Sequence, residues 1–206
     1  ELLQIADLAR ENPNINILSD EIYELILKKE FKHYSLSSLA NDLKDRIFII
    51  NGFAKGWAMT GWRIGYLVGP KDVIKASSAL QSQSTSNVCS FVQKGALEAL
   101  KINNEYFSMI NSHYDQRRRL LYEGLNNING IYIEEPNGAF YAFPKLPNSS
   151  ITSVDFCNKA LQDYGLVVVP GKAFGADQCI RISCAASEIK IKDGLQRLEK
   201  AISEYY

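Results

Sequence analysis

Short apolar runs alternate with longer amphipathic stretches in the first half of the chain, and this alternation limits the fold more than any other feature. The apolar runs predict strands at residues 15–18, 46–51 and 62–69. The amphipathic stretches predict helices at residues 1–12, 71–84 and 88–100. The predicted apolar face of the first helix consists of Leu2, Ile5, Leu8 and Ala9. Strands that alternate with helices are typical of an α/β protein.

The second half of the chain has a different pattern. Residues 103–127 form one helical stretch of about 25 residues, which is long for a globular protein and is expected to link two lobes. Beyond it the pattern predicts strands and helices of a smaller α+β lobe, at residues 130–133, 139–143, 154–164, 167–169, 180–183 and 187–205. We therefore expect three parts, which are residues 1–102, 103–127 and 128–206.

Composition narrows the class of protein. The 206 residues carry no net charge, and 46% of them are hydrophobic, which is ordinary for a globular protein. Without a charge excess, neither nucleic acid nor a charged membrane surface is expected as a partner. No apolar run approaches the ~20 residues of a membrane span. We therefore expect a soluble protein of the cytoplasm that carries no signal segment.

Metal binding is not expected from the cysteines and histidines. The four cysteines lie apart with no CxxC pair, and His33 is far from His113. The ligand spacings of a zinc site are therefore missing. The cysteines are expected to be reduced, partly buried thiols.

Lys55 is the first candidate for chemistry. It follows the second predicted strand in a loop of small residues, beside the aromatic side chains of Phe53 and Trp57. Desolvation favours the uncharged amine, which can form a Schiff base with an aldehyde. The alternative is an exposed lysine in a turn.

Asp20 and Tyr23 follow the first predicted strand. A carboxylate at the carboxyl end of a parallel strand lies at the edge where such sheets bind ligands. Asp20 can keep a pyridinium nitrogen protonated there, and Tyr23 can donate to a ring oxygen. The alternative for Asp20 is capping of a helix N-terminus.

Two arginines complete the candidate site. Arg63 lies in the third predicted strand, where an arginine among apolar residues needs an anionic partner such as phosphate. Arg181 alternates with Ile180 and Ile182, so it points away from the face that they bury and can grip a carboxylate by two hydrogen bonds. The alternatives are a surface salt bridge for Arg63 and an exposed strand arginine for Arg181.

Five segments in this order resemble the class I/II aminotransferases, which have the pyridoxal-phosphate (PLP) fold type I. They are SDEIYE (19–24), NGFAKGWAMTGWRIGY (51–66), PNGAFY (136–141), VPGKAFG (169–175) and IRIS (180–183). The chain is most similar to the bacterial aspartate aminotransferase branch, which includes bifunctional aspartate/prephenate enzymes. The resemblance implies a large domain with a mixed, mostly parallel sheet and a small α+β C-terminal domain.

The resemblance also implies the reaction and the roles of the candidates. The enzyme would move an amino group between an amino acid, aspartate or a related one, and a 2-oxo acid. Lys55 would bind PLP covalently and carry the substrate Cα proton, and Asp20 would pair with the pyridine nitrogen. Tyr23 would bond the ring oxygen, Arg63 the phosphate and Arg181 the substrate α-carboxylate. The alternatives are a lyase of the same fold and the ligand-sensing domain of a transcription regulator.

Some features depart from the family pattern. Many relatives have serine where this chain has Ala54, and Gly52 offers no hydroxyl either. No arginine or lysine occurs in residues 76–93, where another branch places the arginine for a distal carboxylate. Dicarboxylate specificity therefore does not follow from this chain. We expect no catalytic or binding role for two other conspicuous features. Residues 117–119 (RRR) are expected to form a solvated helix face, and His113 is expected to be structural or exposed.

Family enzymes are about twice as long as this chain. We therefore expect the chain to be the C-terminal half of such an enzyme. On this expectation the 206 residues alone would bind PLP weakly or not at all and would be inactive, and the full-length protein would be a homodimer.

Overall fold

The computed structural model describes residues 1–147 and 150–206. The chain divides into two compact units, of which the first contains residues 1–27 and 32–107 and the second contains residues 28–31 and 108–206. The boundary falls inside the long helix α5 (Asn104–Asn126). Within the described residues, no helix has the length and apolar character needed to cross a membrane.

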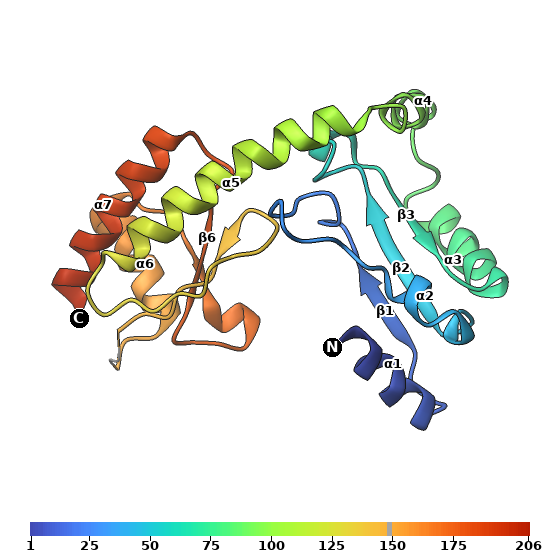
Figure 1. Cartoon of the computed structure of the whole chain (residues 1–206), viewed down its shortest axis with the longest axis horizontal. Helices are drawn as coiled ribbons and strands as arrows, with labels where there is room; N and C mark the ends of the chain where they lie inside the picture. The colour runs from blue at the N-terminus through green and yellow to red at the C-terminus, as the bar shows by residue number, and fades with distance from the viewer. Residues whose placement is uncertain (148–149) are drawn as a thin grey trace. The chain divides into compact units, whose positions relative to one another are not determined.

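A three-stranded sheet forms the centre of the first unit (Figure 1). Its strands are β1 (Ile17–Asp20), β2 (Ile47–Gly52) and β3 (Gly65–Val68), with β2 in the middle. β1 runs parallel to β2, with Asp20 opposite Ile50. β3 runs antiparallel to β2, with Gly65 opposite Gly52. The carboxyl ends of β1 and β2 therefore lie at the same edge of the sheet.

Along the chain, helices precede, separate and follow these strands. They are α1 (Leu2–Glu11), α2 (Leu36–Leu39), α3 (Lys71–Ser84) and α4 (Ser90–Ala99), with short 3-10 helices η1 (Asn41–Leu43) and η2 (Thr60–Trp62). The predicted helix at 71–84 is confirmed at both ends.

The buried side of α1 differs from the predicted apolar face. Ala6 and Ala9 are buried in a cluster with residues of α2 and β2, whereas Leu2, Ile5 and Leu8 are exposed. Small side chains on the inner side let α1 approach its neighbours closely, so the alanines, not the leucines, meet the core.

The third predicted strand begins later than expected. Residues 60–62 form η2, and Arg63 follows with a left-handed backbone (φ 53°). A left-handed residue cannot continue an extended strand. β3 therefore starts at Gly65, and the prediction that Arg63 lies on the strand is wrong.

Gly52 ends β2 and Gly65 begins β3, and these two glycines let the strands approach each other closely where they pair. A Cβ atom on Gly52 would lie 2.7 Å from the Gly65 Cα and 2.9 Å from the Ile64 carbonyl oxygen. These are backbone atoms that cannot move aside. We expect Gly52→Ala to lower the free energy of unfolding by about 1–3 kcal/mol, as overpacking does. Denaturant unfolding measures it.

Gly61→Ala is the matched control, because its added Cβ would meet nothing within 4 Å. Equal unfolding midpoints for the two glycine variants would contradict the close approach of β2 and β3.

The second unit combines a small β-sheet with α-helices. Its small sheet has the order β4-β6-β5, all antiparallel, formed by β4 (Tyr141–Ala142), β6 (Ile180–Ser183) and β5 (Val169–Pro170). Besides α5, its helices are α6 (Ser153–Tyr164), α7 (Glu188–Tyr205) and the 3-10 helix η3 (Gly171–Phe174). Two sequence signals are confirmed here, since Gly165 ends α6 in a left-handed conformation and the Ser187 hydroxyl caps α7.

The run of three arginines on α5 is only partly the solvated face that the sequence predicted, because its middle residue is buried. Arg118 is only 4% exposed, whereas Arg119 is exposed and paired with Glu123. The Arg118 guanidinium donates to the Ala139 carbonyl oxygen and to the Asp115 carboxylate. Ala139 has a left-handed backbone (φ 53°), so Arg118 holds a strained turn. His113 is exposed, as expected.

The free thiols differ sharply in burial. Cys89 is exposed, whereas Cys157, Cys179 and Cys184 are buried. Burial raises the pKa of Cys157 and of Cys184 to about 11, so few of these thiols are ionised at pH 8. We expect Ellman's reagent at pH 8 to modify one thiol per folded chain rapidly. In Cys89→Ser the rapid phase should vanish, and a persisting rapid phase would contradict the burial.

Candidate active site

Asp20 ends β1 at the sheet edge shared with β2. It is exposed, and its Oδ1 accepts the backbone N–H of Ile22 at 3.2 Å. The following residues form turns, so Asp20 caps a turn and not the helix considered above. Tyr23 lies within this turn and is half-buried.

Lys55 lies in the loop that follows β2. The loop packs on the segment that carries Tyr23, because an added Cβ on Gly56 would lie 2.9 Å from the Leu25 side chain. Its other side is fixed by Trp57, whose indole N–H donates to the Ala99 carbonyl at 3.0 Å. Lys55 is half-buried, with its Nζ 5.7 Å from the centre of the Tyr23 ring. The fold thus brings Lys55 and Tyr23 together.

Arg63 lies at the far end of the same loop, just before β3. Its side chain is exposed, and its Nη1 donates to the Thr60 carbonyl oxygen at 2.9 Å. Within residues 1–147 and 150–206, no acidic side chain pairs with Arg63. The surface salt bridge considered from the sequence is therefore absent there, and the guanidinium can take an external anion.

Arg181 lies on β6 of the second unit. Two aromatic rings lie close to its guanidinium, with the Tyr141 ring centre 4.5 Å and the Phe174 ring centre 4.6 Å from the central carbon. The side chain is half-buried and differs from the exposed strand arginine considered above. Contact with aromatic rings leaves the positive charge in place, so the guanidinium N–H groups can still bind an anion.

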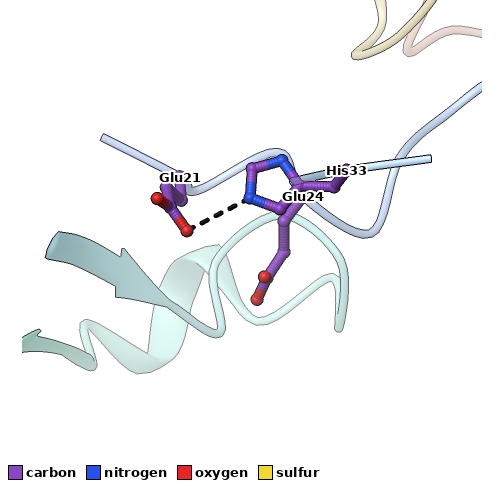
Figure 2. Close-up of side chains that lie close together, drawn as sticks. All are labelled: Glu21, Glu24 and His33. Carbon is purple, nitrogen blue, oxygen red and sulfur yellow. Dashed lines mark hydrogen bonds and ion pairs between the residues drawn. The ribbon is translucent and has the colours of Figure 1, made fainter. Parts of the chain in front are cut away.

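A polar cluster that was not predicted from the sequence includes residues next to Asp20 and Tyr23 in the chain. Figure 2 shows its three members, Glu21, Glu24 and His33, whose possible ligand atoms lie within 4.8 Å of one another. Glu21 is 6% exposed, and its carboxylate is 3.1 Å from His33 Nε2. Hydroxyl groups of Ser19 and Ser35 also donate to Glu21, at 3.0 and 2.9 Å. The buried carboxylate is thus satisfied by protein donors.

The cluster also connects the two loops that carry the site. The Asn51 amide donates to Glu24 at 2.6 Å, and Asn51 stands at the end of β2 just before the lysine loop. Tyr66 faces Asn51 across the sheet, and burial, with the negative charges of Glu24 and Glu21, raises its pKa. The Glu24–Asn51 bond therefore fixes the Asp20–Tyr23 turn against the Lys55 loop.

Known proteins resemble this chain over nearly all of its length. The family described as aminotransferase class I and II matches residues 1–198. A probable aspartate/prephenate aminotransferase of Rickettsia typhi is 42% identical over 98% of this chain and 53% of its own length. An aspartate aminotransferase of Pyrococcus horikoshii is 39% identical over 96% of this chain and 51% of its own. The chain spans about half the length of the curated relatives it matches.

Solved structures give the same answer. The aspartate aminotransferase of Rhizobium meliloti superposes with a TM-score of 0.88 at 37% identity, over 97% of this chain and 52% of its own. An aromatic aminotransferase of Pyrococcus horikoshii gives 0.90 at 34% identity, over 98% and 55%. The fold class predicted from the sequence is confirmed by these matches. The chain therefore belongs to the class I and II aminotransferase family.

Proposed function

We propose that this chain is the part of a PLP-dependent aminotransferase that holds the reactive lysine. The reaction would move an amino group between an amino acid, aspartate or a related one, and a 2-oxo acid. The observation that carries the proposal is the Lys55 amine lying over the Tyr23 ring, beside the sheet edge where Asp20 ends β1. Because the matched relatives are about twice as long, the activity is proposed for the full gene product.

The side chains of the first unit fit PLP in their chemistry. Lys55 offers an amine to the aldehyde, and Asp20 offers a carboxylate to the ring nitrogen. Tyr23 offers a phenol to the ring oxygen. Arg63 offers a guanidinium with no acidic partner in the described part of the chain, which suits a phosphate.

The residues divide the work of the reaction. Bound PLP supplies an electron-withdrawing ring that acidifies the substrate Cα–H. Lys55 acts as the general base that moves the proton at Cα. Asp20 keeps the ring nitrogen protonated by its negative charge. Arg181 binds the α-carboxylate by two parallel hydrogen bonds and thereby orients the Cα–H bond.

We further propose the domain and assembly assignments that the resemblance implies. Residues 1–102 would belong to the PLP-binding large domain, residues 103–127 would form the connecting helix, and residues 128–206 would form the small domain. The full gene product would be a cytoplasmic homodimer that acts on free amino acids and 2-oxo acids.

Borohydride labelling tests the central assignment. The full gene product is incubated with PLP and reduced, and the phosphopyridoxyl group is located by peptide mass spectrometry. We expect the label on Lys55, because its amine is held beside the proposed ring site. Equal labelling of Lys55→Ala would refute the proposal, and Lys71→Ala, a change at the exposed start of α3, is the control.

The product assay separates the alternatives. Aspartate with 2-oxoglutarate yields glutamate in a transamination, whereas a lyase acting at Cβ or Cγ yields none. PLP binding without turnover would instead support a ligand-sensing domain.

A further inference from the structure

Strand pairing in the small sheet places the first of the two aromatic rings beside Arg181. Tyr141 on β4 lies opposite Ser183 of β6, so its side chain shares a face with Arg181, two residues away. The diagonal neighbour is within reach of an aromatic side chain, and the ring covers one face of the guanidinium at 4.5 Å. The first ring is therefore placed by strand pairing.

The second ring comes from the short turn η3. Phe174 ends this turn, and its ring centre lies 4.6 Å from the Arg181 guanidinium, although the residue is 49% exposed. Phe143 packs edge-on against Phe174, with ring centres 5.7 Å apart. Half of a large apolar side chain thus remains in water while its ring rests on a cation.

The turn that presents Phe174 is rigidly anchored. Ser153 is fully buried, and its hydroxyl donates to Asp177 at 2.6 Å and accepts the Lys172 backbone N–H at 3.1 Å. Gly171 lies so close to the returning chain that an added Cβ would be 2.2 Å from the Ala176 carbonyl oxygen. Hydrogen bonds and close backbone packing therefore fix the turn that carries Phe174.

The rings orient the guanidinium without neutralising its charge. An acidic partner would also fix Arg181, but it would compete with an incoming carboxylate. In the described part of the chain no acidic side chain pairs with Arg181. Aromatic rings carry no net charge, so contact with them leaves the full positive charge of Arg181 available to a carboxylate.

We propose that Tyr141 and Phe174 are positioning residues that hold the Arg181 guanidinium in place for the substrate α-carboxylate and so set the preference for α-amino acids over amines without that carboxylate. This inference rests on the proposed function, in which Arg181 binds the α-carboxylate. The rings act by preorganisation, because a guanidinium already fixed loses less freedom on binding.

The test compares aspartate with β-alanine, which is the same amine donor without the α-carboxylate. We expect Phe174→Leu and Tyr141→Leu each to raise the KM for aspartate about 5- to 30-fold, the size of a partly desolvated cation–π contact, with a much smaller change in kcat. The single-turnover rate constant for β-alanine should not fall, since it does not use Arg181. Phe174→Tyr and Tyr141→Phe keep the rings and should restore the aspartate KM.

A double-mutant cycle separates this inference from the proposed function. In an Arg181→Leu background, Phe174→Leu should have no further effect on aspartate, because the ring acts through the guanidinium. An unchanged aspartate KM in Phe174→Leu and Tyr141→Leu, with a raised KM in Arg181→Leu, would overturn the positioning role alone. An additive effect of Phe174→Leu in the Arg181→Leu background would overturn it as well. An unchanged KM in Arg181→Leu would overturn the carboxylate site itself.

Discussion

Lys55→Ala is expected to abolish transamination by the full gene product. A positioned general base alone contributes about 10²–10⁴-fold to the rate, and the variant also loses the amine proposed to bind the cofactor covalently. We therefore expect kcat for aspartate and 2-oxoglutarate to fall by at least about 10³-fold. A coupled assay of the oxaloacetate formed measures it.

Lys71→Ala provides the comparison for this prediction. Lys71 is an exposed lysine at the start of α3, and nothing in the proposed chemistry uses it. A kcat of Lys55→Ala within tenfold of the unchanged protein would remove Lys55 from the reaction. Rescue of Lys55→Ala by added methylamine would support a role as proton carrier.

Arg118→Ala is expected to destabilise the second unit strongly. The side chain is 4% exposed and holds both the Asp115 carboxylate and the Ala139 carbonyl. Removing one partner of a buried charge pair costs about 3–5 kcal/mol. We expect the lower end, about 3 kcal/mol, because the Asp115 side chain remains 31% exposed and keeps part of its hydration. Urea unfolding followed by circular dichroism measures it.

The neighbouring arginine is the natural control. Arg119 is exposed and forms a surface pair with Glu123 on the same helix, and such pairs contribute little. Arg119→Ala should therefore leave the unfolding midpoint nearly unchanged. Equal midpoints for the two arginine variants would mean that the turn at Ala139 is held by other contacts.

Local signals in the sequence were sufficient for the elements whose ends are set by local chemistry. The helix Lys71–Ser84 follows Pro70, and α6 ends at a left-handed Gly165, so both could be predicted from neighbouring residues. The start of β3 could not, because a non-glycine residue in the left-handed region gives no sequence signal. Arg63 adopts that conformation here and delays the strand.

Contacts between distant residues were the part that the sequence could not supply. Arg118 is buried because it bonds Ala139, 21 residues away, and the periodicity of α5 does not contain that contact. Glu21 meets His33 and Ser35 only after the chain turns, so the cluster behind the site was missed. Two acids flanking Ile22 and Tyr23 in a buried segment were the available signal.

The pairing of Gly52 with Gly65 holds together the two ends of the loop that carries Lys55 and Arg63. Beyond this pair, the Phe53 N–H still bonds the Ile64 carbonyl at 3.3 Å, and the Met59 N–H bonds the Phe53 carbonyl at 3.2 Å. These bonds extend the pairing of β2 with β3 into the loop. Lys55 and Arg63 should therefore belong to one cooperative opening unit, whose amides exchange with solvent deuterium together and not one end at a time. The Lys55 amine and the Arg63 guanidinium would then change their spacing mainly when the strand pair itself is lost.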